Sequence, residues 1–187
     1  MKLKNSIAAA GLSIVGLVAL GTAFAVDKTE IDSRVTAAVA DFEAINTSHK
    51  SLIGKSAGML VFPRVTKGGA GVAAEHGEGA LLVGGKTVGY YSVGAASVGL
   101  TLGLAKHSEI ILFMTKDSLD KFLATRGWSI GADAGITVVS GGATGTYDSK
   151  IVEKPILGFI YAEKGLIGDL SLEGEKISKL KTGNGNS

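Results

Sequence analysis

Glycine alternates with short apolar runs through residues 57–103, and this pattern restricts the fold more than any other feature of the chain. Between positions 94 and 105 the even sites carry bulky residues such as Leu102 and Leu104, whereas the odd sites carry small ones. A strand of this kind places its bulky row in a core, while its glycine side bends sharply or admits another backbone closely. Residues 130–139 repeat the scheme. Such strands predict a curved sheet.

Continuous apolar runs at 59–62, 110–114 and 156–161 are typical of strands that are covered on both faces. Together with the glycine-rich segments they predict an α+β fold that is mainly β. We expect a small, curved, partly closed, glycine-rich antiparallel sheet or barrel, with an N-terminal amphipathic helix and one further helix.

The N-terminal helix is expected over residues 27–48, where apolar residues recur on one face and Thr29 and Asp32 form the capping pair. Five acids against two basic residues in this segment disfavour a helix that lies in a membrane interface, so we expect packing on the protein's own sheet. The second helix is expected from Lys116 or Asp117 to Thr125. Trp128 follows as a packing anchor between helix and sheet.

The first 25 residues have the pattern of an export signal. Lys2 and Lys4 begin it, residues 7–20 are almost entirely apolar, and a small-x-small site ends at Ala25. The apolar run is shorter than the ~20 residues of a membrane span. We therefore expect a cleaved signal peptide at 1–25, a single domain at 26–187, and a periplasmic protein that can associate peripherally with a membrane.

Charge and cysteine content exclude several classes of protein. The chain has 19 Lys and Arg against 17 acids, and loss of Lys2 and Lys4 with the leader leaves 17 against 17. A globally basic nucleic-acid binder is not indicated, so we expect no nucleic-acid partner. Because the chain has no cysteine, its stability in an oxidising compartment must come from its core.

Two acid-free stretches nevertheless concentrate positive charge. No acid occurs between Glu43 and Glu75, or from Gly79 to Ser108. If the fold brings these stretches together, their basic residues attract anionic headgroups by about 1 kcal/mol each; the alternative is ordinary solvated lysines scattered around loops. The candidate lipid-binding residues are Lys50, Lys55, Arg64, Lys67 and Lys86.

Catalytic patterns fail their tests of context. Residues 80–87 mimic a phosphate loop, but the leading glycine is alanine and the segment has a strand pattern. Residues 69–74 resemble a dinucleotide fingerprint without a strand before and a helix after. Residues 95–99 fall one glycine short of a nucleophile elbow, which leaves Ser97 a small residue on a tight face. We expect no enzyme, no catalytic residue and no cofactor.

Metal ligands are not indicated either, because the three histidines are far apart in the sequence. Residues 75–78 combine two carboxylates with His76, but we interpret them as a hairpin connection with exposed charges. Asp133 stands out on an apolar strand. It is either a buried acceptor that ties loops together or a functional carboxylate, and we favour the structural role because a buried charge needs partners.

Three separated blocks of the chain resemble one family. They are residues 57–103, residues 111–135 (ILFMTKDSLDKFLATRGWSIGADAG) and residues 158–174 (GFIYAEKGLIGDLSLEG). Their order is similar to that of the SYLF family, a lipid-binding domain that also occurs in eukaryotic actin regulators. The resemblance implies an exported lipid-binding module for acidic phospholipid or lipid-like anions, which binds at an anionic membrane surface.

The chain also departs from the family pattern. Ala73 and Ala74 stand where glycines are common, and Thr101 and Ala105 stand where glutamines are frequent. These changes argue against relying on a polar interior pocket, and we do not transfer phosphoinositide specificity or actin binding to an exported protein. Two other interpretations stay open, a small outer-membrane-associated structural β-barrel protein and an unrecognised hydrolase. The sequence assigns no protein partner.

Overall fold

A computed structural model describes residues 27–139, 147–163, 165–167 and 171–181, except the side chains at 98–102. The predicted signal peptide at 1–25 lies outside the described residues. Among the described helices, none is both long and apolar enough to cross a membrane.

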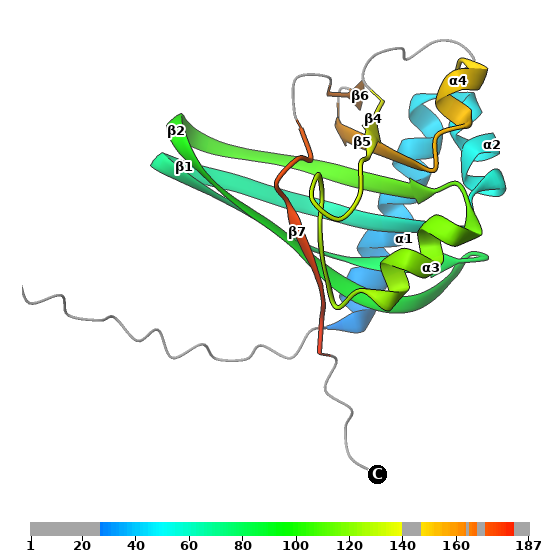
Figure 1. Cartoon of the computed structure of the whole chain (residues 1–187). Coiled ribbons are helices and arrows are strands. Elements are labelled where there is room, and N and C mark those ends of the chain that lie inside the picture. Colours follow the sequence, from blue (N-terminus) through cyan, green and yellow to red (C-terminus); the bar gives the residue numbers. More distant parts are fainter. Residues whose placement is uncertain (1–26, 140–146, 164, 168–170, 182–187) are drawn as a thin grey trace, which may run out of the picture.

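Helices and strands alternate irregularly along the chain (Figure 1). The helices are α1 (Lys28–Ile45), α2 (Thr47–Lys55), α3 (Lys116–Ala124) and α4 (Ser149–Val152). The strands are β1 (Gly58–Val83), β2 (Lys86–Phe113), β3 (Gly127–Ser129), β4 (Thr137–Val138), β5 (Ile156–Ala162), β6 (Gly165–Leu166) and β7 (Lys176–Lys179).

The strands form one sheet, in the order β3-β7-β2-β5-β4, with β1 paired to β2 and β6 to β5. All pairings are antiparallel except the short one between β4 and β5. The prediction of a mainly β fold with an N-terminal helix is confirmed. In the part of the chain that the structure describes, the sheet is open and does not close on itself.

The long hairpin of β1 and β2 dominates the sheet. It turns at Gly84 and Gly85, whose positive φ values of 57° and 76° suit glycine. The hairpin is also folded back on itself, so that the two halves of β1 touch: a Cβ on Gly79 would lie 1.9 Å from the carbonyl oxygen of Val61. The predicted close approach of another backbone is therefore real, and glycine permits it.

Helices α1 and α2 cover one face of the sheet (Figure 1). Ile31, Val35, Ala38 and Phe42 of α1 are buried against it, and the Tyr161 hydroxyl of β5 donates to the carbonyl oxygen of Ala38 at 2.6 Å. The expectation that this helix packs on the protein's own sheet is confirmed.

The other face is covered by α3 and the C-terminal segments. Trp128 packs there against Phe122 of α3 and Phe113 of β2, with ring centroids 5.2 Å and 6.0 Å away. Helix α3 and the anchoring role of Trp128 match their predictions. The predicted runs at 59–62 and 156–161 are buried throughout, so both their faces are covered as expected. The run at 110–114 is buried as far as Phe113, and Met114 at its end is half-buried.

Two predicted helical features are wrong. The helix expected over 27–48 ends at Ile45, and Asn46 starts a new helix because its side chain accepts a hydrogen bond from the Ser48 amide at 2.8 Å. The cap of α1 is Asp27, which accepts from the amides of Thr29 and Glu30.

Three predicted β features are also wrong. Residues 130–139 do not form one strand, because the chain turns at Gly131 with a φ of 93° and only Thr137–Val138 re-enters the sheet. Residues 75–78 lie inside β1 and are not a hairpin connection. Leu104, expected in the core, is 68% exposed; Val98, Leu100 and Leu102 have side chains outside the described set.

Candidate functional site

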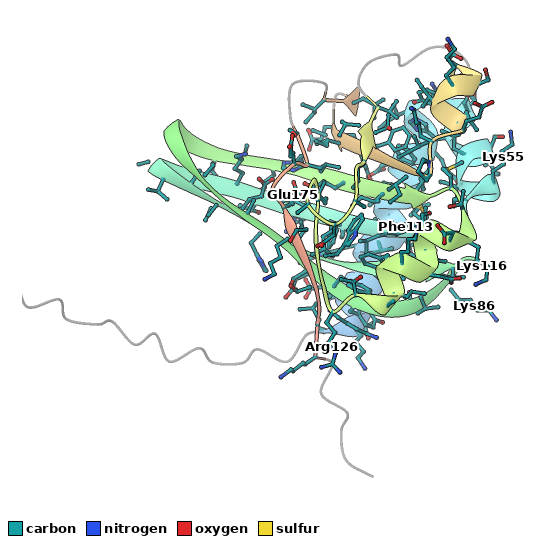
Figure 2. All side chains as sticks on the ribbon, in the orientation of Figure 1. Lys55, Lys86, Phe113, Lys116, Arg126 and Glu175 are labelled. Atoms are coloured by element: carbon teal, nitrogen blue, oxygen red, sulfur yellow. The ribbon has the colours of Figure 1, made fainter. Side chains whose placement is uncertain are left out.

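A cluster of charged side chains is buried between the hairpin and the segment that leads into β7. Alternation along β1 and β2 turns Glu75, His107 and Glu109 toward the sheet face that carries α3 and β7. Glu175 comes from the turn before β7 and lies over the hairpin in Figure 2. We call Glu75, His107, Glu109 and Glu175 the buried cluster.

The fold-back of the hairpin brings these residues together. Gly77 lies against Val65 and Arg64 of the first half of β1, so Glu75, two residues earlier, falls beside Lys67. The Lys67 ammonium is 3.3 Å from the Glu75 carboxylate. Glu175 is held from the opposite side, because its amide donates to Leu172 and its carbonyl oxygen accepts from Ile130.

His107 is the centre of the buried cluster. Its Nε2 lies 2.7 Å from Oε1 of Glu109 and 3.2 Å from Oε1 of Glu75. Burial by itself lowers the pKa of His107, but hydrogen bonds and charge from both glutamates outweigh burial and raise that pKa to about 9. The hydrogen bond from His107 in turn holds the pKa of Glu75 below its ordinary value.

The two most buried carboxyls behave differently. Burial raises the pKa of both Glu109 and Glu175. For Glu109 the hydrogen bond and charge of His107 oppose this rise, whereas for Glu175 the charges of Glu109 and Glu75 raise the pKa further. Within the described residues, Nδ1 of His107 and Oε2 of Glu109 and of Glu175 meet no hydrogen-bond donor, although the two carboxyls can hydrogen-bond to each other when one of them is protonated. Such unpaired buried polar atoms are costly and call for an explanation.

A small cavity of about 110 Å³ adjoins the buried cluster. Glu75 and Glu175 line it, together with Lys67, Ser97 and Ser171. The sequence pattern does not predict this site, because Lys67 and Glu75 meet only through the fold-back. One signal was present: His107 and Glu109 are two apart in a strand pattern and share a face just before a fully apolar run.

A second feature is the uncovered bend at which the hairpin folds back on itself. It consists of residues 68–73 of β1 and 97–105 of β2, it is distinct from the turn at Gly84 and Gly85, and we call it the hairpin tip. It extends beyond β7 with no helix over it (Figure 1). It contains no charged residue, and it exposes Val72 and Leu104 by 61% and 68%. Register places Lys67 and Lys106 on opposite faces at its base.

The structure divides the five predicted basic residues into two groups. Lys55 ends α2, and Lys86 lies at the hairpin turn; Figure 2 shows both at one end of the molecule, with Lys50 earlier on α2. Arg64 and Lys67 lie farther along β1, toward the hairpin tip. Arg64 lines a hollow of about 250 Å³ with Arg34 and Glu78, among others.

The remaining candidates have structural surroundings. Asp133 accepts a hydrogen bond from the Ser129 amide at 2.6 Å, so it ties a loop as predicted, although it is exposed and not buried. Ser97 and His76 lie on opposite faces of the hairpin by register, so they do not form a nucleophile and base pair.

Comparison with protein families identifies the second half of the chain. Residues 94–186 match the family Ysc84, described as Las17-binding protein actin regulator, which is the SYLF domain. The predicted resemblance to the SYLF family is thus confirmed over residues 94–186. This match includes two of the three blocks on which the resemblance was based. The SYLF domain is known as a lipid-binding and actin-regulator domain and is not known as an enzyme family. No curated protein matches the chain.

Proposed function

We propose that this SYLF protein is an exported lipid-binding module that docks on membrane surfaces rich in acidic phospholipid. The observation that carries the proposal is the hairpin tip, which projects from the body, has no charge and exposes Val72 and Leu104. Exposed apolar surface of this kind marks sites of protein or membrane contact. The acid-free stretches on either side favour an anionic membrane.

The physical terms suit shallow, reversible binding. Burying a Val or Leu side chain contributes about 1.5–3 kcal/mol, and a basic residue near an anionic surface about 1 kcal/mol. Val72 and Leu104 would enter the headgroup region, while Lys106 and Lys67 meet phosphates on the two sides. Lys67 contributes less than a free lysine because Glu75 already balances part of its charge.

We assign headgroup contact to Lys67 and Lys106, and to Arg64 behind them. Lys50, Lys55 and Lys86 lie toward the other end, roughly 40 Å from the hairpin tip at about 3.3 Å per strand residue. These three lysines remain predicted lipid-binding residues, in a separate electrostatic contact with the membrane. Export to the periplasm, the single domain at 26–187 and the absence of catalysis belong to the same proposal and rest on the sequence.

Co-sedimentation with vesicles tests the docking surface. The mature chain is mixed with phosphatidylglycerol-containing or pure phosphatidylcholine vesicles across a salt series. We expect binding to the anionic vesicles alone, weakened as salt screens the lysines. The double variant Val72→Ser with Leu104→Ser should reduce the bound fraction at least about tenfold, since it removes a few kcal/mol of burial.

A matched control separates position from composition. Val88→Ser with Leu123→Ser removes one Val and one Leu that are also exposed, by 52% and 48%, but away from the hairpin tip. This control should bind like the wild type. Equal loss in both double variants, or unchanged binding of the tip variant, would overturn the assignment. Loss in a Lys55→Glu and Lys86→Glu variant alone would move the docking surface to the other end.

A further inference from the structure

The buried cluster has the donor atoms of a metal site. One donor atom from each of Glu75, His107 and Glu109 lies within 4.8 Å of the others. Ligand atoms around an ion at ~2.1 Å lie roughly 3.0–3.4 Å apart, so the 2.7 Å and 3.2 Å distances from His107 Nε2 require only small shifts. Glu75 comes from the second half of β1, and His107 and Glu109 come from β2 where it pairs with the first half of β1, so the fold-back of the hairpin sets their relative positions.

An independent observation points to a bound ion. Glu109 and Glu175 are 0% and 2% exposed, yet each presents an oxygen that accepts no hydrogen bond from any described residue. Buried carboxylates are normally paired or coordinate a metal. Glu175 lies near enough to Glu109 and Glu75 to feel the repulsion of their charges, so it is the fourth buried side chain beside these three donors.

The kind of ion follows from the ligands. Imidazole suits zinc, iron, copper and nickel, whereas carboxylates also suit manganese, and the chain offers no thiol. Calcium and magnesium prefer sites built from oxygen alone. The 110 Å³ cavity beside Glu75 and Glu175 gives solvent access.

We propose that Glu75, His107, Glu109 and Glu175 bind one divalent transition-metal ion, Zn²⁺ or Mn²⁺, between the hairpin and the segment before β7. The ion would join the long hairpin to the C-terminal segment, because Glu175 is the ligand that comes from outside the hairpin. The metal site does not involve Val72 or Leu104, so metal binding and membrane docking are tested independently of each other.

Titration of the chelator-stripped full chain tests the proposal. Isothermal calorimetry with ZnCl₂, and electron paramagnetic resonance with MnCl₂, should show about one ion per chain for at least one of the two metals. The melting temperature should rise with that metal and not with equimolar Mg²⁺. Glu175→Gln and His107→Gln should each weaken binding by at least about tenfold, while His76→Gln, which removes an exposed histidine, should not.

A second measurement on the wild type guards against misfolded variants. Side-chain nitrogen NMR resolves three histidines, of which His49 and His76 are assigned through their Gln variants. Zn²⁺ should change the resonances of the remaining one, His107, in a one-to-one titration. Absence of binding by the stripped wild type, a response confined to His76, or unchanged affinity in folded Glu175→Gln would each overturn the metal site.

Discussion

The two faces of the sheet each bury a histidine, and they hold the two imidazoles in opposite ways. On the face of α1 and α2, His49 stacks on Phe42 with centroids 3.8 Å apart, and its nitrogens meet the Phe42 carbonyl oxygen at 2.6 Å and the Tyr147 hydroxyl at 2.5 Å. On the other face, His107 lies between two carboxylates.

The groups around a buried histidine therefore decide whether it is charged, and burial alone does not. Burial lowers the pKa of His49, and the hydrogen bond to Phe42 only partly opposes it. For His107 two negative neighbours reverse the effect of burial. On the face covered by α1 and α2, apolar packing stabilises the protein and both ring nitrogens of His49 have hydrogen-bond partners. The face covered by α3 and the C-terminal segments contains buried charges, which need partners.

The largest expected effect tests the apolar face. Phe42→Ala should lower the free energy of unfolding by about 3–5 kcal/mol, because Phe42 is fully buried against His49, Phe159 and Tyr161. Urea unfolding followed by circular dichroism measures it. A decrease in the free energy of unfolding of less than about 1 kcal/mol would show that the face covered by α1 and α2 is not tightly packed around Phe42.

The next prediction concerns the charged face and is measured in chelator. Glu109→Gln should cost about 3 kcal/mol, because it removes a charged partner from buried His107. Glu175→Gln should cost less than about 1 kcal/mol, since burial and its acidic neighbours already favour the neutral form of Glu175. Equal costs in the two variants would contradict this division of charge.

The pH dependence of His49 gives a smaller effect. Its folded pKa is below the ordinary 6.5, so the unfolded chain takes up a proton at higher pH than the folded one. This contribution to stability is complete above about pH 6.5 and falls as the pH drops toward the folded pKa, by at most about 1.4 kcal/mol per pH unit. Urea unfolding at pH 7.5, 6.5 and 5.5 should show a shallower decline in His49→Gln. An equal decline of stability with falling pH in the wild type and in His49→Gln would refute this contribution of His49.

The smallest effect concerns how α1 is attached. Asp32 accepts hydrogen bonds from the Thr87 and Tyr90 hydroxyls at 2.9 Å and 2.8 Å, which join the helix to β2. Asp32→Ala should destabilise the protein by about 1 kcal/mol. Asp41→Ala, at an exposed position of the same helix, is the control and should change stability by less than about 0.5 kcal/mol. A melting-temperature comparison distinguishes the two.

Much of the fold could be predicted from local pattern. The spacing of Ile31, Val35, Ala38 and Phe42 predicted a helix that packs inward, and the apolar run 110–113 predicted a strand buried on both faces. The errors arose where a single side chain overrode the pattern. Asn46 divides the first helix by capping the second, and the periodicity on either side of it carries no sign of that break.

The site was harder to predict because its members are distant in the sequence. The sequence predicts a free cation at Lys67 and a turn carboxylate at Glu75, yet the two form an ion pair. It also predicts one basic face, whereas Lys55 and Lys86 lie at one end of the molecule and Arg64 and Lys67 lie toward the other. The alternation along a strand predicts which residues share a face, but it does not predict which distant segments a fold-back brings together.

Composition and periodicity by themselves determined that this chain forms a glycine-rich sheet with helices on it, since both depend on neighbours a few residues apart. Only the tertiary structure decided that the hairpin folds back, that an uncharged tip projects from it, and that two glutamates flank His107. Those outcomes depend on glycines such as Gly79 that let backbones touch, and on residues a hundred positions apart, such as Glu75 and Glu175, that come to line one cavity.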